Sequence, residues 1–531
     1  MNKTGSAIGR RWQKISTDNQ MILIAAIAAF LSGLVFQTAG GSTFNGICWI
    51  AAHAVMLAMP VMFVIAVIWS VRRGKGATDS TVHLLIAEGF LLRLFYNAML
   101  PFDFMQNDLE WFINEGEDMQ FGHLGYIFYI FEHWRLPNAD PMLVEHYQYY
   151  HPPLHHFLSA VWMKMYALLG VDAEFWTEAL QMLPLLYMTI LLIYMNKLGK
   201  LFDCSALGRC VTVGLAAFFP YSVFMGSALN NDTLMILLGV MCLYYTVKWY
   251  RNPTMKGILL MAVCIGCSMM AKLSGVLIAP AMAIVMLWRL FQDRQEWKKY
   301  FRQFLCFGLV SFPLGLWYSV LRYVQYGMPL GYVMSPEGTG TQYIGWYSKL
   351  DRFRNFKYAL SSLSLRWDWL EGDFNIPVSL VKYGVFNELD YYQTNDFTYV
   401  LGTVVFWATF ALFFLFVAAF IAWLFMKEYK VIDKVFLGVA AVVILVSYVY
   451  FCWEYPYVCT MNIRYVMTAV YIGMLVTGLV ISDFQKRLRE KERKTAGQVF
   501  DCAVGAGFGV YMLCCVLLML TVVALYSPTI S

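Results

Sequence analysis

The sequence predicts an all-α polytopic membrane protein with about 13 transmembrane helices and interfacial helices in its first large external loop. Two observations carry this prediction. The 531 residues are 60% hydrophobic and only 14% charged, with a mean hydropathy of +0.57, whereas soluble domains are about 45–50% apolar and about 25% charged. The apolar residues also gather in blocks of about 20, the length that crosses a bilayer as a helix.

The predicted spans come from apolar blocks tested against the distribution of basic residues. The candidate blocks are 21–41, 47–71, 81–101, 154–170, 179–200, 208–228, 233–249, 256–271, 273–292, 302–322, 400–426, 433–452, 462–482 and 504–527. Lys and Arg concentrate on the cytoplasmic side of membrane proteins. If block 154–170 does not cross, the basic connectors all fall on one side, and they hold 27 of the 39 Lys and Arg residues. This predicts a multi-pass protein of the cell membrane with a cytoplasmic N-terminus and an extracytoplasmic C-terminus.

Block 154–170 is therefore predicted to be an amphipathic helix lying along the outer face. His151-Pro152-Pro153 precedes it, and proline suits the first turn of a helix, where its missing N–H costs nothing. The block belongs to external loop 102–178, and a second long external loop covers residues 323–398. Long loops on a compact scaffold commonly carry function, so chemistry is expected on the outer face. The basic residues lie in short runs between apolar blocks, which argues against nucleic-acid binding.

Two acidic residues follow the third predicted span, at the point where it leaves the membrane. Asp108 is the candidate catalytic base and Asp103 a supporting residue, because a carboxylate at a partly dry boundary beside bound lipid can accept a proton. The alternative is an ordinary hydrated acidic loop.

Histidines are concentrated in the same loop, with six of the eight between residues 123 and 156. His151 and His155 are spaced i, i+4, and Glu117 or Asp118 would complete a divalent-metal site with them. The alternative is a Tyr- and His-rich interfacial helix at the depth of the lipid headgroups. No cofactor is required by the pattern, and a divalent metal stays open as an alternative.

Three further motifs place charged residues at the outer ends of spans. Asp232 ends the sequence Asn230-Asn231-Asp232, Lys272 lies at the turn between blocks 256–271 and 273–292, and Arg464-Tyr465 opens the twelfth span. Cations at this level would hold a phosphate, Arg through its bidentate fork and Lys as a point charge. Long basic side chains also snorkel to anchor the ends of spans, which is the alternative interpretation.

In their order along the chain, these motifs resemble those of the C-type integral-membrane glycosyltransferases, in particular the protein O-mannosyltransferase and lipid A aminoarabinose transferase branch. The shared elements are Gln106-Asn107-Asp108, Gly122-His123-Leu124-Gly125-Tyr126, His151 to Leu154, Asn230-Asn231-Asp232, Lys272 to Gly275 and Arg464-Tyr465. The resemblance covers about residues 81–482, the expected catalytic core. Residues 1–80 then form an N-terminal addition with two helices, and residues 483–531 a basic cytoplasmic loop with a final helix.

The resemblance implies transfer of a monosaccharide from a polyprenyl-phosphate-linked donor to an acceptor hydroxyl on a glycan, a lipid or a protein at the extracytoplasmic face. Asp108 would accept the hydroxyl proton, and direct displacement would invert the sugar configuration. Lys272 and Arg464 would stabilise the departing lipid phosphate. Residues expected to bind or support the substrate are Asp103, His123, His151, Asp232 and Tyr465.

Two other functions share this topology. A transporter or flippase of a lipid-linked glycan would need ionisable residues near the middle of the membrane and broken paired spans. Only Glu88 is such an intramembrane charge, and the candidate groups gather at one face, which favours surface chemistry. A glycan polymerase or ligase with lipid-diphosphate donors is disfavoured only by the order of the motifs.

Overall fold

The computed structural model describes residues 16–35, 54, 58, 61, 78–102, 104, 122–146, 148–334, 340, 342–366, 372–389, 394–490 and 494–527. In its first half the helices are α2 (Thr17–Val35), α4 (Asp79–Met99), α6 (Gly122–His133), α7 (Leu154–Leu168), α8 (Trp176–Leu180), α9 (Met182–Leu201), α10 (Ala206–Phe218), α11 (Pro220–Phe224), α12 (Asn231–Arg251) and α13 (Met255–Ala271). In its second half they are α14 (Ala279–Gln292), α15 (Trp297–Tyr326), α16 (Asp351–Arg354), α17 (Phe356–Ala359), α18 (Ile376–Phe386), α19 (Asp396–Phe425), α20 (Val431–Glu454), α21 (Met467–Glu490) and α22 (Lys494–Tyr526).

Short 3₁₀ segments connect several of these helices. They are η3 (Val144–His146), η4 (Ala173–Phe175), η5 (Leu273–Ile278), η6 (Arg294–Glu296), η7 (Val458–Met461) and η8 (Ile463–Val466). Within the described ranges the β structure consists of a single antiparallel bridge between Tyr343 and Tyr457.

The all-helical polytopic class is confirmed. Ten described helical segments are long and apolar enough to cross a membrane. Large apolar side chains point outward along several of them, with Leu309 and Phe312 on α15 and Phe414 and Val417 on α19 all more than half exposed. Soluble proteins rarely expose apolar surface on this scale. A bilayer therefore provides the surroundings that these faces require.

The predicted number of 13 spans is not confirmed. The predicted span 208–228 is broken, because α10 ends at Phe218 and α11 starts at Pro220. Proline lacks the N–H that would continue the helical hydrogen bonds and disfavours a helical conformation in the residue before it. The predicted span 256–271 corresponds to α13, which has 17 residues and lies at the lower limit for crossing. Block 47–71 lies mostly outside the described residues.

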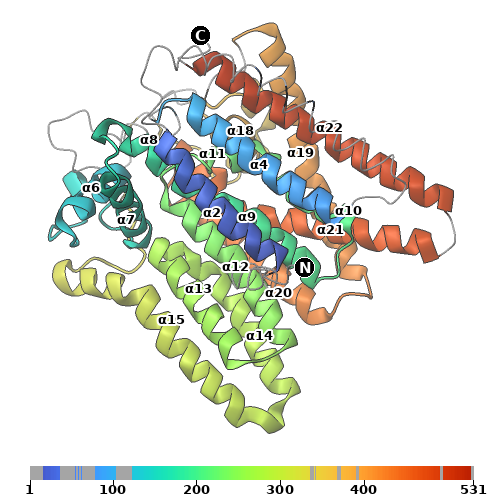
Figure 1. Ribbon diagram of the computed structural model, residues 1–531, viewed down its shortest axis with the longest axis horizontal. Coiled ribbons are helices and arrows are strands. Elements are labelled where there is room, and N and C mark those ends of the chain that lie inside the picture. Colours follow the sequence, from blue (N-terminus) through green and yellow to red (C-terminus); the bar gives the residue numbers. More distant parts are fainter. Residues whose placement is uncertain are drawn as a thin grey trace, which may run out of the picture.

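The centre of the bundle is formed by α9, α12 and the α21 region, whose spanning windows are 72–89% buried. Figure 1 shows α13, α14 and α15 extending to one side of these helices, and α19 and α22 lying on the other. The packing of α10 against α21 depends on two glycines. A Cβ on Gly208 would lie 2.3 Å from the carbonyl oxygen of Gly478, and a Cβ on Gly478 would lie 2.5 Å from that of Gly208. Small residues let two membrane helices approach with their backbones in contact.

The segment predicted to be the first external loop contains the helix predicted there. Helix α7 begins directly after Pro153 and has 15 residues, too few to cross a bilayer, and it is not among the ten candidate spans. It packs against α6 and contacts α12 and α13. Figure 1 shows α6 and α7 together at one edge of the molecule, next to the ends of these two helices.

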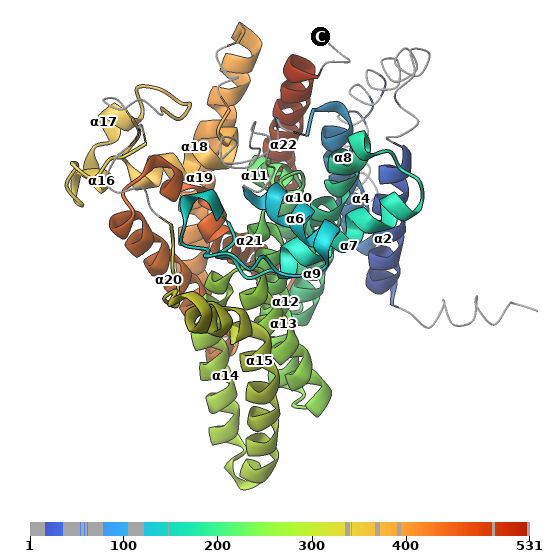
Figure 2. The same ribbon diagram turned by 90° about the vertical axis from the view of Figure 1, so that its left-hand side faces the viewer.

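The second external segment, with α16, α17 and α18, lies beside α19 in Figure 2. Its start is held by backbone hydrogen bonds to the stretch before α21. Ile344 N–H donates to the Pro456 oxygen at 2.9 Å, and Val458 N–H donates to the Gln342 oxygen at 2.9 Å. Inside the segment, Lys382 and Asp373 form an ion pair at 2.9 Å with both side chains fully buried. The two backbone hydrogen bonds bring residues 342–344 next to the start of η7.

Candidate active site

A cavity of about 760 Å³ opens where the first external loop, the second external segment and the ends of the central helices meet. Its walls come from the start of α12, from η5, from the outer half of α20 and from the stretch 455–468. The first loop contributes His123, Gln148 and His151. Residues 328–334 cover it from the end of α15. Parts of the chain more than 300 residues apart therefore share one concave surface, the usual form of a small-molecule site.

Two cations in the wall of this cavity, Lys272 and Arg464, meet one buried carboxylate, Asp232. Lys272 Nζ lies 2.8 Å from each carboxylate oxygen of Asp232, and Arg464 Nε lies 3.7 Å from Asp232 Oδ2. The Asp232 side chain is 2% exposed, whereas that of Lys272 is 15% exposed. The two cations therefore share one carboxylate.

The local fold explains why these three side chains converge. Asp232 occupies the first turn of α12, and the side chain of Asn230 caps that helix by accepting from the Asp232 N–H at 2.8 Å. Asn231 Nδ2 donates to the Ala271 oxygen at 3.1 Å, which joins the start of α12 to the end of α13. Lys272 follows in an extended conformation, so its side chain is delivered to Asp232 at this junction.

Gly275 permits the tight turn that follows Lys272. Its N–H donates to the Lys272 oxygen at 2.8 Å, and a Cβ at this position would lie 2.4 Å from Ser268 Oγ and 2.7 Å from the Ser268 carbonyl carbon. Only a residue without a Cβ allows η5 to approach α13 this closely. The sequence Lys272 to Gly275 therefore works as one structural unit.

Tyr465 positions both cations. Lys272 Nζ lies 5.0 Å from the centre of the Tyr465 ring, within the range of a cation–π interaction. Arg464 Nη2 donates to the Tyr465 hydroxyl at 3.0 Å. Asn462 starts η8 by accepting from the Arg464 N–H at 3.0 Å. The structure thus brings together Asp232, Lys272, Arg464 and Tyr465, four of the residues singled out from the sequence.

Three histidines of the first loop form a stacked cluster beside these cations. His123 Nδ1 and His156 Nε2 share a hydrogen bond of 2.9 Å, and the rings of His123 and His151 stack with centroids 5.8 Å apart. Burial lowers the pKa of all three well below the usual range. The charges of Lys272 and Arg464 lower the pKa of His123 and His151 further. These imidazoles are neutral at pH 7 and act as hydrogen-bonding groups.

The structure places His151 and His155, which the metal prediction paired, in different surroundings. His151 lines the cavity and stacks on His123 and Tyr150. His155 is fully buried against His156 and Tyr187, and burial lowers its pKa to about 4. The i, i+4 spacing does not place them on one face because α7 begins only at Leu154. Among the described residues, no three His, Cys, Asp or Glu side chains form a group that could hold a metal.

Asp103, Asp108, Glu117 and Asp118 lie outside the described residues. The catalytic role of Asp108 and the metal role of Glu117 and Asp118 therefore stay predictions.

The sequence interpretation missed Gln148, Gln342 and Tyr455, which also line the cavity. Gln148 is 4% exposed, and its Oε1 has no hydrogen-bond partner in the described part of the chain. It also adopts a left-handed conformation with φ of 75°. The Tyr-rich stretch before the His-Pro-Pro motif was the available signal for Gln148. Nothing in the local pattern pointed to Gln342 or Tyr455, because only the folding of the second segment onto η7 brings them here.

Comparison with known proteins points to the same class of protein. Residues 150–317 match the family model described as dolichyl-phosphate-mannose-protein mannosyltransferase. No curated protein matches the sequence. The matched residues 150–317 include His151, Asp232, Lys272 and Gly275.

Three solved structures are similar at low sequence identity. The oligosaccharyltransferase of Archaeoglobus fulgidus in its apo form is 13% identical, with 85% of this chain covered and a TM-score of 0.49, and the chain spans 56% of the length of that protein. Cupriavidus metallidurans ArnT is 11% identical in both its apo state and its state bound to undecaprenyl phosphate. The TM-scores are 0.46 and 0.43, with 83% and 84% of this chain and 78% of ArnT covered in each.

Over residues 150–317 the chain is similar to the dolichyl-phosphate-mannose-protein mannosyltransferases, which confirms the resemblance to the C-type membrane glycosyltransferases that its motifs predicted.

Proposed function

We propose that the protein transfers a monosaccharide from a polyprenyl-phosphate-linked donor to an acceptor hydroxyl at the extracytoplasmic face, with inversion of the sugar configuration. The observation that carries this proposal is that Lys272 and Arg464, which line a cavity of about 760 Å³, converge on one buried carboxylate. Two cations held in place at one site suit a ligand whose phosphate becomes more negative as the reaction proceeds.

In this mechanism Asp232 orients the cations before the donor arrives. Two positive side chains at close range repel each other, and the carboxylate between them offsets that repulsion. Their ammonium and guanidinium groups are therefore already in place when the sugar–phosphate bond breaks. Such preorganised charge costs no rearrangement during the reaction, and this is the main reason that it accelerates the step.

The remaining groups have distinct tasks in the proposal. Asp108 accepts the proton of the acceptor hydroxyl as its oxygen attacks the anomeric carbon, and the lipid phosphate leaves from the opposite face. Neutral His123 and His151, together with the amide of Gln148, offer hydrogen bonds to sugar hydroxyls. Apolar cavity residues on α12 and α20, Ile236 and Ile444, suit the first isoprene units of the lipid.

The test is a transfer assay with the purified protein, a set of radiolabelled polyprenyl-phosphate hexoses, and membrane extract as the source of acceptor. Wild-type protein is compared with Asp108→Asn, Lys272→Gln and Arg464→Gln. Lys298→Gln is the matched control, because Lys298 is exposed at the start of α15. Transfer that is retained in the control and lost in the other three supports the proposal.

Two results contradict it in different ways. Full activity of Asp108→Asn removes that residue from its role and leaves the class intact. A wild-type protein that transfers none of the sugars, but equilibrates labelled lipid between the leaflets of liposomes, replaces the transferase with the flippase.

A further inference from the structure

A second pocket lies at the opposite end of the bundle from the Asp232 cluster. Lys248, in its wall, is sixteen residues beyond Asp232 on α12, and at 1.5 Å per residue this places the pocket about 24 Å away along the helix. That separation approaches the thickness of the hydrocarbon core, about 30 Å. The pocket and the candidate active site therefore face opposite sides of the membrane.

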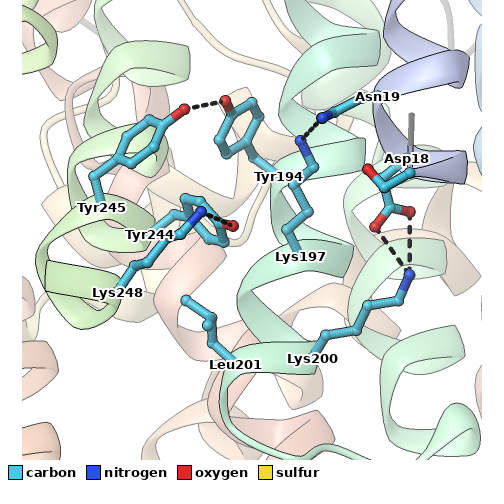
Figure 3. Close-up of a pocket in the computed structure, with 10 residues that line it drawn as sticks. Asp18, Asn19, Tyr194, Lys197, Lys200, Leu201, Tyr244, Tyr245 and Lys248 are labelled. Carbon is cyan, nitrogen blue, oxygen red and sulfur yellow. Dashed lines mark hydrogen bonds and ion pairs between the residues drawn. The ribbon is translucent and has the colours of Figure 1, made fainter. Parts of the chain in front are cut away.

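Three lysines and three tyrosines line this pocket, whose volume is about 340 Å³. The lysines come from the ends of α9 and α12 and are Lys197, Lys200 and Lys248, and the tyrosines are Tyr194, Tyr244 and Tyr245. Figure 3 shows Lys197 and Lys200 extending from α9 toward α2, where Asn19 and Asp18 accept hydrogen bonds from them.

The positive charge of the pocket exceeds its negative charge. Lys200 is neutralised by Asp18, with Nζ–O distances of 2.9 and 3.1 Å. Lys197 has a neutral partner, because its Nζ donates to Asn19 Oδ1 at 2.6 Å and lies 4.5 Å from the centre of the Tyr194 ring. Lys248 Nζ donates to the Tyr244 hydroxyl at 3.4 Å. In the described part of the chain, neither Lys197 nor Lys248 forms an ion pair.

The adjoining N-terminal sequence supplies no counter-charge. Residues 1–15 precede the pocket residue Ser16 and contain four Lys or Arg and no Asp or Glu. Basic residues on this side of a membrane protein are common and usually lie apart. Here two lysines with neutral partners share one concave surface with phenol groups that can donate hydrogen bonds. This arrangement differs from separate snorkelling side chains because it presents several donors to a single ligand.

We propose that this pocket binds a phosphate-bearing anion between α2, α9 and α12, through Lys197 and Lys248. Its position at the ends of spanning helices favours the headgroup of an anionic lipid, since basic pockets between membrane helices commonly hold such headgroups. A soluble phosphate ester shares the same chemistry. Binding would attach α2 to the core of the bundle, because Lys197 contacts Asn19 at the start of α2 and Lys248 lines the same pocket.

The experiment uses full-length protein, stripped of lipid in neutral detergent. It is titrated with dioctanoyl phosphatidylglycerol, dioctanoyl phosphatidylcholine or glycerol phosphate, and binding is followed by native mass spectrometry and by the midpoint of thermal unfolding. The test variant is Lys197→Gln/Lys248→Gln. The matched control is Lys298→Gln/Lys299→Gln, which removes the same charge from the exposed start of α15. Lys197→Arg/Lys248→Arg retains the charge, and the unfolding midpoint of the glutamine variant without ligand shows whether that variant still folds.

The proposal expects phosphatidylglycerol to bind more tightly than phosphatidylcholine. Removing both lysines should weaken it roughly 25-fold, at roughly fivefold for each basic residue near the membrane surface. The control and the arginine variant should bind like the wild type. If glycerol phosphate binds as tightly as phosphatidylglycerol, and the test variant loses that binding, the site is assigned to a soluble ester and the lipid source is overturned. Equal binding by wild type and test variant, or equal loss in test and control variants, overturns the site.

Discussion

Replacing Lys272 by glutamine tests whether the charge of the Asp232 cluster supports sugar transfer. In the wild type, two cations share one carboxylate, with Lys272 Nζ at 2.8 Å from both of its oxygens and Arg464 Nε at 3.7 Å. The substitution removes one of these two cations. A departing phosphate then meets one cation fewer.

The expected loss can be estimated from comparable groups. Removing one preorganised donor from a site where negative charge develops lowers kcat about 10²–10³-fold, so a loss of this size is expected for Lys272→Gln. Breaking a buried ion pair costs about 3–5 kcal/mol when the remaining charge has no other partner. Arg464 stays beside Asp232 and the Lys272 side chain is 15% exposed, so we expect about 2 kcal/mol of lost stability.

The assay measures kcat and KM for a polyprenyl-phosphate sugar together with the thermal unfolding midpoint. Lys272→Arg keeps the charge and should retain more than a tenth of the wild-type kcat. The double variant Asp232→Asn/Lys272→Gln should lose less stability than the two single variants together, because it removes both members of the pair. A kcat for Lys272→Gln within threefold of the wild type would refute the electrostatic role. Equal losses in Lys272→Gln and Lys272→Arg would show that shape rather than charge is needed.

Three further predictions concern stability. Burial lowers the pKa of His155 to about 4 and those of His123, His151 and His156 well below 6.5. The unfolded chain therefore binds more protons below pH 6.5, and the free energy of unfolding should be flat from pH 8 to 7 and fall below pH 6.5, by up to about 1.4 kcal/mol per buried histidine per pH unit. The thermal unfolding midpoint should fall with it, and less steeply in His155→Gln. A midpoint that rises on acidification contradicts this. Gly275→Ala should destabilise the protein by about 1–3 kcal/mol, because its Cβ would meet Ser268 at 2.4 Å. In the same thermal assay the control Gly497→Ala should be neutral or stabilising, since a Cβ there has nothing within 4 Å. Equal effects of the two substitutions would rule out the close contact. Lys382→Met should cost about 3–5 kcal/mol by leaving Asp373 buried without its main partner, and Lys382→Met/Asp373→Leu should recover most of that loss in chemical unfolding; a double variant as unstable as the single one would contradict the pairing.

Much of the candidate site could be predicted because its members share one level of the membrane. Asp232, Lys272 and Arg464 each end or open an apolar block, and the ends of spans on one side necessarily lie at one depth. The spacing of His151 and His155 misled because the i, i+4 rule applies only within a helix, and α7 starts between them. The choice of α7 as a helix outside the set of spans was correct, since charge balance across the membrane depends on the sequence alone.

The sequence by itself determined the membrane class, the helical first loop and the set of charged residues at the ends of apolar blocks, because hydropathy and charge act along the chain at short range. Only the tertiary structure decided that Asp232 forms ion pairs with both cations, that Gln148 and Gln342 line the same cavity, and that Lys197 and Lys248 share a pocket. These contacts depend on how helices cross and how closely they approach. Such crossings are set by packing between distant segments, as in the contact of Gly208 with Gly478.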